Sequence, residues 1–292
     1  MFTSIRPAFL ACLFFLMLAM PTQKALAAKF KTVDFPNAVE TDLNEINNFN
    51  AGVGFYVDQA GIAHGFLATA EKMTSFDVPG ATATYAYGIN DKRQAVGWYV
   101  DSAGTQHGFA YNPPKFVTID PPNSILTNAW AVGNSGTVVG TYVDATDGAY
   151  HGFTYYFGKY TTYDAPGATT TELTGLNERT QMVGIYLDAN SEEHGFYIDE
   201  RGNFTDITHP GSSVTAADRL NTTINQTYNI VGLYGNSSSG PFSGYLLRDK
   251  KFTTVMYPGS IETRVRGIND ASWLVGRYTD SSGIIHGFVL VP

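Results

Sequence analysis

Short apolar runs separated by polar turns occupy most of the chain, and a helical period is absent. Residues 88–101 (GINDKRQAVGWYVD) contain two β-rich runs joined across Asn90–Arg93. The next two runs turn at Asp101–Gly104 and at Pro113–Pro114, residue types that suit tight turns. The pattern therefore predicts a meander of four antiparallel strands, followed by a Pro-Gly-Ala-Thr type loop.

This four-stranded unit recurs six times with a period of about 43 residues. A Val-Gly-x-Tyr motif on the second strand marks every copy, with its glycine at Gly54, Gly97, Gly140, Gly184, Gly232 and Gly276. Seven residues before each glycine stands an asparagine, at Asn47, Asn90, Asn177, Asn225 and Asn269, with Gly133 in the third copy. The third strand begins with His-Gly-Phe in all copies but the fifth, which has Ser243-Gly244-Tyr245.

Six repeats of this size predict an all-β fold, a six-bladed β-propeller of four-stranded antiparallel blades. Residues 29–35 resemble a fourth strand with no blade before it, and residues 286–292 resemble a third strand with no fourth after it. We therefore expect the N-terminal strand to complete the last blade, which would close the ring and hide two strand edges.

Residues 1–27 are predicted to be a signal peptide that is removed. Arg6 precedes the apolar run from Ala8 to Met20, and Ala25-Leu26-Ala27 has the small-x-small pattern of a cleavage site. The run is too short for a permanent membrane span. Residues 28–292 then form a single exported domain, secreted, periplasmic or held in the cell envelope. Cys12 lies in the peptide, so we expect no disulfide.

The charge balance disfavours nucleic acid and anionic membranes as partners. The whole chain has a net charge of −8, and removal of Arg6 and Lys24 with the signal peptide lowers it to −10. Nucleic acid and anionic lipid require clustered Lys and Arg, and the sequence has no basic block. We expect a monomer without a cofactor.

The repeat motifs resemble those of a known bacterial family. Gly-Ile-Asn, Val-Val-Gly-x-Tyr, His-Gly-Phe and Asp-x-Pro-Gly-Ala, at this period, are similar to the extracellular repeats of the HAF family, which is named for His-Ala-Phe. Here the middle residue is glycine. The resemblance covers nearly all of residues 28–292 and implies a secreted or envelope-associated bacterial protein, but it implies no reaction.

Five histidines share the slot before Gly-Phe, and we expect them to pair with aspartates across the hairpin of the third and fourth strands. The expected structural pairs are His64 with Asp77, His107 with Asp120, His151 with Asp164, and, through ring closure, His286 with Asp34. Each pair is expected to form a buried hydrogen bond. In the fourth copy Thr208 replaces the aspartate, and Asp206 or His209 is expected to compensate.

We expect no metal site from these histidines, because equivalent positions on different blades cannot converge on one ion. Aspartates also follow the repeated tyrosines, as Asp58 and Asp101 do. Turn formation explains them better than calcium binding. The tyrosines themselves are expected in the core between blades.

A functional site is expected where the repeats differ. The entries to the innermost strands differ most, and we expect them to meet at the mouth of the central channel. The predicted ligand-binding residues there are Tyr85, Tyr87, Asn128, Trp130, Arg264 and Arg266. Ser212–Leu220 is an enlarged loop on the same face, where we expect a lid or a partner contact.

These features favour a binding or interaction scaffold, with an extracellular glycan as the favoured ligand and an envelope protein as another partner. One alternative is a hydrolase or lyase of polysaccharides, in which Asp42 and Glu172 would be the catalytic carboxylates. Another is a purely structural envelope protein. Motifs of common hydrolases and phosphate-binding enzymes are absent from the sequence, so a non-enzymatic function is expected.

Overall fold

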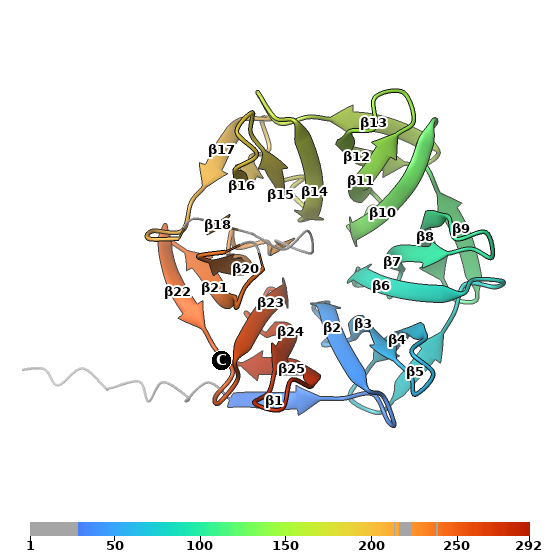
Figure 1. Ribbon diagram of the computed structural model, residues 1–292, viewed down its shortest axis with the longest axis vertical. Helices are drawn as coiled ribbons and strands as arrows, with labels where there is room; N and C mark the ends of the chain where they lie inside the picture. The colour runs from blue at the N-terminus through green and yellow to red at the C-terminus, as the bar shows by residue number, and fades with distance from the viewer. Residues whose placement is uncertain (1–28, 213, 216–222, 238) are drawn as a thin grey trace, which may run out of the picture.

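The computed structural model describes residues 29–212, 214–215, 223–237 and 239–292, and these form six antiparallel sheets arranged in a ring (Figure 1). The innermost strand of each sheet is the one that precedes the Val-Gly-x-Tyr strand along the chain. The predicted six-bladed β-propeller is thereby confirmed. The expected signal peptide, and most of the loop Ser212–Leu220, lie outside the described residues.

The blades follow one another along the chain. Blade 1 contains β2 (Glu40–Ile46), β3 (Gly52–Val57), β4 (Ala63–Ala68) and β5 (Met73–Phe76). Blade 2 contains β6 (Ala83–Ile89), β7 (Ala95–Val100), β8 (Gln106–Asn112) and β9 (Lys115–Ile119). Blade 3 contains β10 (Ser124–Val132), β11 (Val138–Asp144), β12 (Tyr150–Tyr156) and β13 (Lys159–Tyr163).

Blades 4 to 6 follow the same order. Blade 4 contains β14 (Thr170–Leu176), β15 (Met182–Leu187), β16 (Glu193–Ile198) and β17 (Phe204–Ile207). In blade 5, β18 (Val214–Thr215) and β19 (Thr223–Ile224) both pair with β20 (Ile230–Gly235), and β21 (Ser243–Arg248) and β22 (Lys251–Val255) follow. Blade 6 contains β23 (Glu262–Ile268), β24 (Leu274–Thr279) and β25 (Ile285–Val291).

The outer strand of blade 6 is β1 (Lys29–Val33), from the other end of the described chain (Figure 1). It pairs with β25 in antiparallel register, so that Val33 lies opposite Gly287. The Thr32 hydroxyl joins the two ends further, because it bonds the Tyr257 hydroxyl at 2.7 Å and the Tyr278 hydroxyl at 2.9 Å. The predicted closure by the N-terminal strand is confirmed.

In five of the six blades, the glycine of the Val-Gly-x-Tyr motif lies against a bulge in the innermost strand. In blade 1 the register of β2 shifts between Leu43 and Glu45, opposite Gly54. A Cβ atom at Gly54 would lie 1.9 Å from the carbonyl oxygen of Asp42, which no side chain can tolerate. The same approach recurs in four further copies at 2.0–2.1 Å, so these glycines are fixed by backbone contact.

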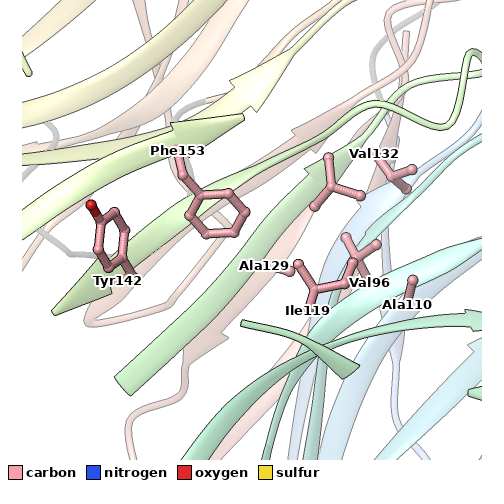
Figure 2. Close-up of a cluster of buried hydrophobic side chains, with 8 residues drawn as sticks. Val96, Ala110, Ile119, Ala129, Val132, Tyr142 and Phe153 are labelled. Carbon is pink, nitrogen blue, oxygen red and sulfur yellow. The ribbon is translucent and has the colours of Figure 1, made fainter. Parts of the chain in front are cut away.

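The hydrophobic core lies between neighbouring blades. Figure 2 shows one such cluster, in which Val96 and Ile119 of blade 2 pack against Ala129 and Val132 of blade 3, with Phe153 nearby. The phenylalanine of every His-Gly-Phe motif is wholly buried. Burial of one such ring stabilises the fold by about 2–3 kcal/mol, so five equivalent rings bind the blades together.

The repeated asparagine links each blade to the next. In blade 1, Asn47 Nδ2 donates to the carbonyl of Asn90 at 3.0 Å, while its Oδ1 accepts the amides of Phe49 and Ala51. Asn90, Asn177, Asn225 and Asn269 donate in the same way to the following blade, at 3.0–3.2 Å. The side chain therefore fixes its own turn and the adjacent blade together. Gly133 has no side chain to do this.

Within the described residues, no helix is long and apolar enough to cross a bilayer.

Candidate functional site

The residues predicted to bind a ligand at the channel mouth are mostly packed against one another. Tyr87 and Trp130 are each only 2% exposed and meet edge to face at 4.8 Å. Tyr85 stacks on Trp98 at 3.9 Å and is partly exposed. Asn128 is buried and accepts a hydrogen bond from Gln106. The prediction that Tyr87 and Trp130 bind a ligand gains no support, because the two buried rings pack against each other.

Arg266 is also sealed from solvent, in an ionic cluster where blade 6 meets blade 1. Its guanidinium lies 3.7 Å from Asp42, and both side chains are 0% exposed. Arg277 approaches the same carboxylate at 3.1 Å and Glu40 at 3.5 Å. Arg264 is partly buried and pairs with Glu262 at 2.5 Å. In this cluster the arginines and carboxylates neutralise each other's charge where blade 6 packs against blade 1.

The ionisation of this cluster follows from its burial. Burial raises the pKa of Glu40, and the nearby Asp42 charge adds to this effect. Burial, together with the charges of Arg277 and Arg266, lowers the pKa of Arg264 to about 9, so its side chain remains charged at neutral pH. Asp42 thus serves as a shared counter-ion.

The two candidate catalytic carboxylates are not presented together. Asp42 lies on β2 and Glu172 on β14, and these strands stand on opposite sides of the ring (Figure 1). Both side chains are buried, and Asp42 is bound to two arginines. The structure therefore offers no exposed carboxylate pair at these positions.

The predicted His–Asp hydrogen bonds are present. Nδ1 of His64 lies 2.9 Å from Asp77, and the other three pairs are separated by 2.7–2.9 Å. They are not buried as expected: the histidine side chains are 18–25% exposed and the aspartates 27–52%. The turn aspartate contributes a second contact, since Asp58 lies 3.4 Å from Nε2 of His64. Each pair thus braces the outer surface of its blade.

The repeated tyrosines stack on these histidines. Tyr56 and His64 have ring centroids 5.1 Å apart, and Tyr56 also stacks on Phe35 at 3.8 Å. Tyr142 and Tyr278 are buried as expected, but the other four repeated tyrosines are partly exposed. The tyrosine therefore covers the His–Asp pair as well as the core.

Blade 4 lacks the aspartate that would pair with His194, and the expected compensation is wrong. Asp206 accepts the hydroxyl of Tyr186 at 2.9 Å, and His209 stacks on Tyr234 of blade 5 at 3.6 Å. His194 instead faces Asp188, with Nε2 and Oδ2 3.5 Å apart. The outer edge of blade 4 is thus chemically different from its neighbours.

The channel mouth on the side of the first hairpin turns carries a ring of polar residues, and the sequence reasoning missed it. One residue comes from each blade, immediately after the asparagine slot, and amides alternate with carboxylates: Asn48, Asp91, Asn134, Glu178, Gln226 and Asp270. The amide N–H of each residue is bound by the side chain of the next at 2.6–2.9 Å in five steps of the ring.

The alternation has an electrostatic reason. The Asn48 amide donates to Asp91 at 3.1 Å and to Asp270 at 2.9 Å, so one neutral group separates two negative charges. Carboxylates in adjacent blades would repel one another and lack donors. The space at this mouth is only about 70 Å³. The ring therefore leaves little room at this mouth and links neighbouring blades by hydrogen bonds.

A larger groove opens between blades 4 and 5, where the repeat departs most from its period. It encloses about 730 Å³. Its aromatic lining is Tyr197, Tyr228 and Phe252, and its polar lining includes Thr205, Asp206, Thr208, Asp249 and Lys250. Tyr228 is 46% exposed, and Arg179 holds its hydroxyl at 2.7 Å with the guanidinium 5.2 Å from the ring centre. An exposed ring is thus held in place beside hydrogen-bonding groups.

The equivalent groove between blades 2 and 3 shows what is special about this one. It encloses about 290 Å³, and Ala110 and Gly136 stand where the larger groove has Tyr197 and Tyr228. The position of Tyr228 has positive φ in every blade, and Tyr228 itself has φ 62°. An aromatic residue is unusual in that conformation, since glycine and asparagine adopt it more easily. Comparison of the repeats could have found Tyr228 by this signal.

The fold and these surfaces define a six-bladed β-propeller whose blades carry distinct surface chemistry. No family model matches the sequence, and no curated protein matches it. The structure is similar to a variant of the Aleuria aurantia lectin in complex with α-methyl-L-fucoside, with a TM-score of 0.54 and 11% identity, over 90% of this chain and 97% of that one.

Two further solved structures share the fold. A variant of AofleA from Arthrobotrys oligospora matches with a TM-score of 0.57 and 9% identity, over 90% of this chain and 86% of that one. The propeller domain of the Trilobed protease from Pyrococcus furiosus, described as having an open velcro topology, matches with a TM-score of 0.53 and 9% identity, over 86% and 81%. At these identities the likeness establishes the fold alone.

Proposed function

We propose that this protein is an exported carbohydrate-binding scaffold, and that the groove between blades 4 and 5 holds the glycan. The groove itself carries the proposal, because it combines about 730 Å³ of open space with an exposed aromatic ring and charged neighbours. Sugars present apolar C–H faces to aromatic rings and hydroxyls to polar side chains. The fucoside in the structurally similar Aleuria lectin supports this ligand class.

The groove replaces the channel mouth as the favoured site. Tyr228 is fixed by Arg179, and its hydroxyl also lies 3.4 Å from Glu200, so little side-chain freedom would be lost on binding. Asp249 and Lys250, at the turn between β21 and β22 of the same blade, also line the groove and offer both an acceptor and donors to hydroxyl groups. The polysaccharide-hydrolase alternative gains no support, because Asp42 and Glu172 are buried on opposite blades.

The test is glycan-array binding of the purified protein, followed by calorimetry with the best glycan and with α-methyl-L-fucoside. Tyr228→Gly should weaken binding about five- to tenfold, because a stacking contact contributes about 1 kcal/mol or more. Glycine suits the positive φ and is the residue of blade 3, Gly136, so the fold should be retained. Phe157→Ala, at the smaller groove, is the matched control and should leave affinity unchanged.

The proposal is overturned if no glycan binds, or if Tyr228→Gly binds as tightly as the unaltered protein. Release of sugar products during the assay would instead favour an enzyme.

Export belongs to the same proposal. The motif resemblance to the HAF repeats and the pattern of residues 1–27 support a protein outside the cytoplasm. N-terminal sequencing of protein recovered from the medium or the envelope should begin at Ala28. A full-length cytoplasmic product with Met1 retained would contradict it.

A further inference from the structure

Blade 4 differs from blades 1, 2 and 6 at two positions near its histidine, one in the hairpin between β15 and β16 and one just after β17. Where blades 1, 2 and 6 have Ile62, Thr105 and Ile284, four residues after the turn aspartate, blade 4 has Glu192. On the other side of the histidine, Thr208 replaces the aspartate that binds Nδ1 elsewhere. Blade 4 therefore lacks the aspartate that binds the histidine in other blades, and it has an additional carboxylate, that of Glu192, at the turn.

These differences bring three metal-ligating side chains together. One ligand atom from each of Asp188, Glu192 and His194 lies within 4.8 Å of the others. Nε2 of His194 and Oδ2 of Asp188 are 3.5 Å apart, close to the edge of about 3.3 Å that two ligands span around tetrahedral Zn²⁺. Small side-chain movements would complete the geometry.

The backbone of the hairpin brings these side chains close to one another. His194 lies opposite Tyr186 in the ladder, and the turn is closed by bonds between Asp188 and Glu192 and between Ser191 and Asp188, both at 3.0 Å. Glu192 lies in the turn just before β16, two residues from His194, and a carboxylate oxygen of Glu192 lies within 4.8 Å of a ring nitrogen of His194. Tyr186 stacks on the imidazole at 4.9 Å and orients it.

The Asp188 carboxylate is oriented as well. Its Oδ1 accepts the backbone amides of Asn190 and Glu192 at 2.8 and 2.9 Å, and its Oδ2 points toward His194, with the Asn190 side chain at 3.4 Å. These bonds hold the carboxylate in one orientation.

We propose that Asp188, Glu192 and His194 form a binding site for one divalent transition-metal ion, with Zn²⁺ as the expected occupant. An imidazole with two carboxylates suits zinc, whereas calcium and magnesium prefer oxygen ligands alone. Three protein ligands leave a fourth position for water or an oxygen of a ligand. The histidines of the other blades do not share this ion, because each remains on its own blade.

The experiment is calorimetric titration of the metal-stripped full chain with Zn²⁺, supported by the visible spectrum of bound Co²⁺. We expect one ion per chain. Glu192→Thr, which recreates the hairpin of blade 2, should lower the affinity at least about tenfold, and His194→Gln should abolish specific binding. His107→Gln is the matched control and should bind Zn²⁺ like the unaltered protein. The melting temperature of each metal-free variant establishes that it is folded.

Absence of Zn²⁺ binding would overturn the proposal. Equal losses in His107→Gln and His194→Gln would also overturn it, because they would show diffuse binding to surface histidines. Preference for Ca²⁺ over Zn²⁺ would refute the assigned ion class. None of these readouts depends on a glycan, so the metal site and the proposed function fail separately.

Discussion

The asparagine that joins neighbouring blades permits two opposite predictions about stability: its removal should destabilise the fold, and its introduction where it is missing should stabilise the fold. Asn47→Ala removes the 3.0 Å bond to the carbonyl of Asn90 and two bonds to amides of its own turn, at 3.0 and 2.9 Å. A buried hydrogen bond contributes about 1 kcal/mol net. We expect the free energy of unfolding to fall by about 2–3 kcal/mol.

The third copy supplies the gain, because it has Gly133 at this position. A Cβ added there would have no neighbour closer than 3.6 Å, so a side chain fits. Gly133→Asn can donate to the carbonyl of Asn177 in blade 4, as its equivalents do. We expect a gain of about 1 kcal/mol from that bond and about 0.5 kcal/mol from the stiffer unfolded chain.

Differential scanning calorimetry measures both effects. For a domain of this size 1 kcal/mol corresponds to about 2–4 °C, so Gly133→Asn should melt about 3–6 °C higher and Asn47→Ala about 4–12 °C lower. Gly133→Ala restricts the unfolded chain without adding the hydrogen bond, so its melting temperature should rise less than that of Gly133→Asn. If Gly133→Asn melts no higher than Gly133→Ala, the carbonyl of the next blade is not the important partner and the reasoning is refuted.

Three further predictions concern the charged and closing contacts. Asp42→Asn should destabilise the fold by about 3–5 kcal/mol in denaturant titration, since Arg266 and Arg277 lose their shared counter-ion; a neutral effect would contradict the ionic role. Thr32→Val should cost about 1–2 kcal/mol by removing the bonds to Tyr257 and Tyr278, and an unchanged melting temperature would count against this closure contact. Burial of its ring opposes the charged form of His107, but Asp120 and Asp101 raise its pKa overall. The stabilisation from the charged imidazole is complete below the unfolded pKa of about 6.5 and is lost as the pH rises through the folded pKa. Between pH 5.5 and 8 the free energy of unfolding should therefore fall less in His107→Gln than in the unaltered protein. Parallel curves of unfolding free energy against pH for the two proteins would refute this.

Much of the architecture follows from the sequence because each repeat encodes one blade by local signals. The Val-Gly-x-Tyr and His-Gly-Phe motifs fix strand order and register, and the opposite phases of residues 29–35 and 286–292 predict the closure between β1 and β25. The pairing of His64 with Asp77 follows from the same register. All of these depend on spacing along one or two strands.

Which side chains near the channel are exposed to solvent, by contrast, depends on how the blades pack in the ring. Tyr87 and Trp130 stand at positions that differ between repeats, yet side chains from adjacent blades converge near the axis and bury each other. The hydrogen bonds from Asn48 to Asp91 and Asp270 form only when the ring brings residues of three separate blades together, so the sequence alone does not reveal them. The groove at Tyr228 likewise forms only where residues of two blades come together. The sequence alone determined the blades and their order, because those are set by local strand pairing; which side chains face solvent was decided by the tertiary structure, because burial depends on partners distant along the chain.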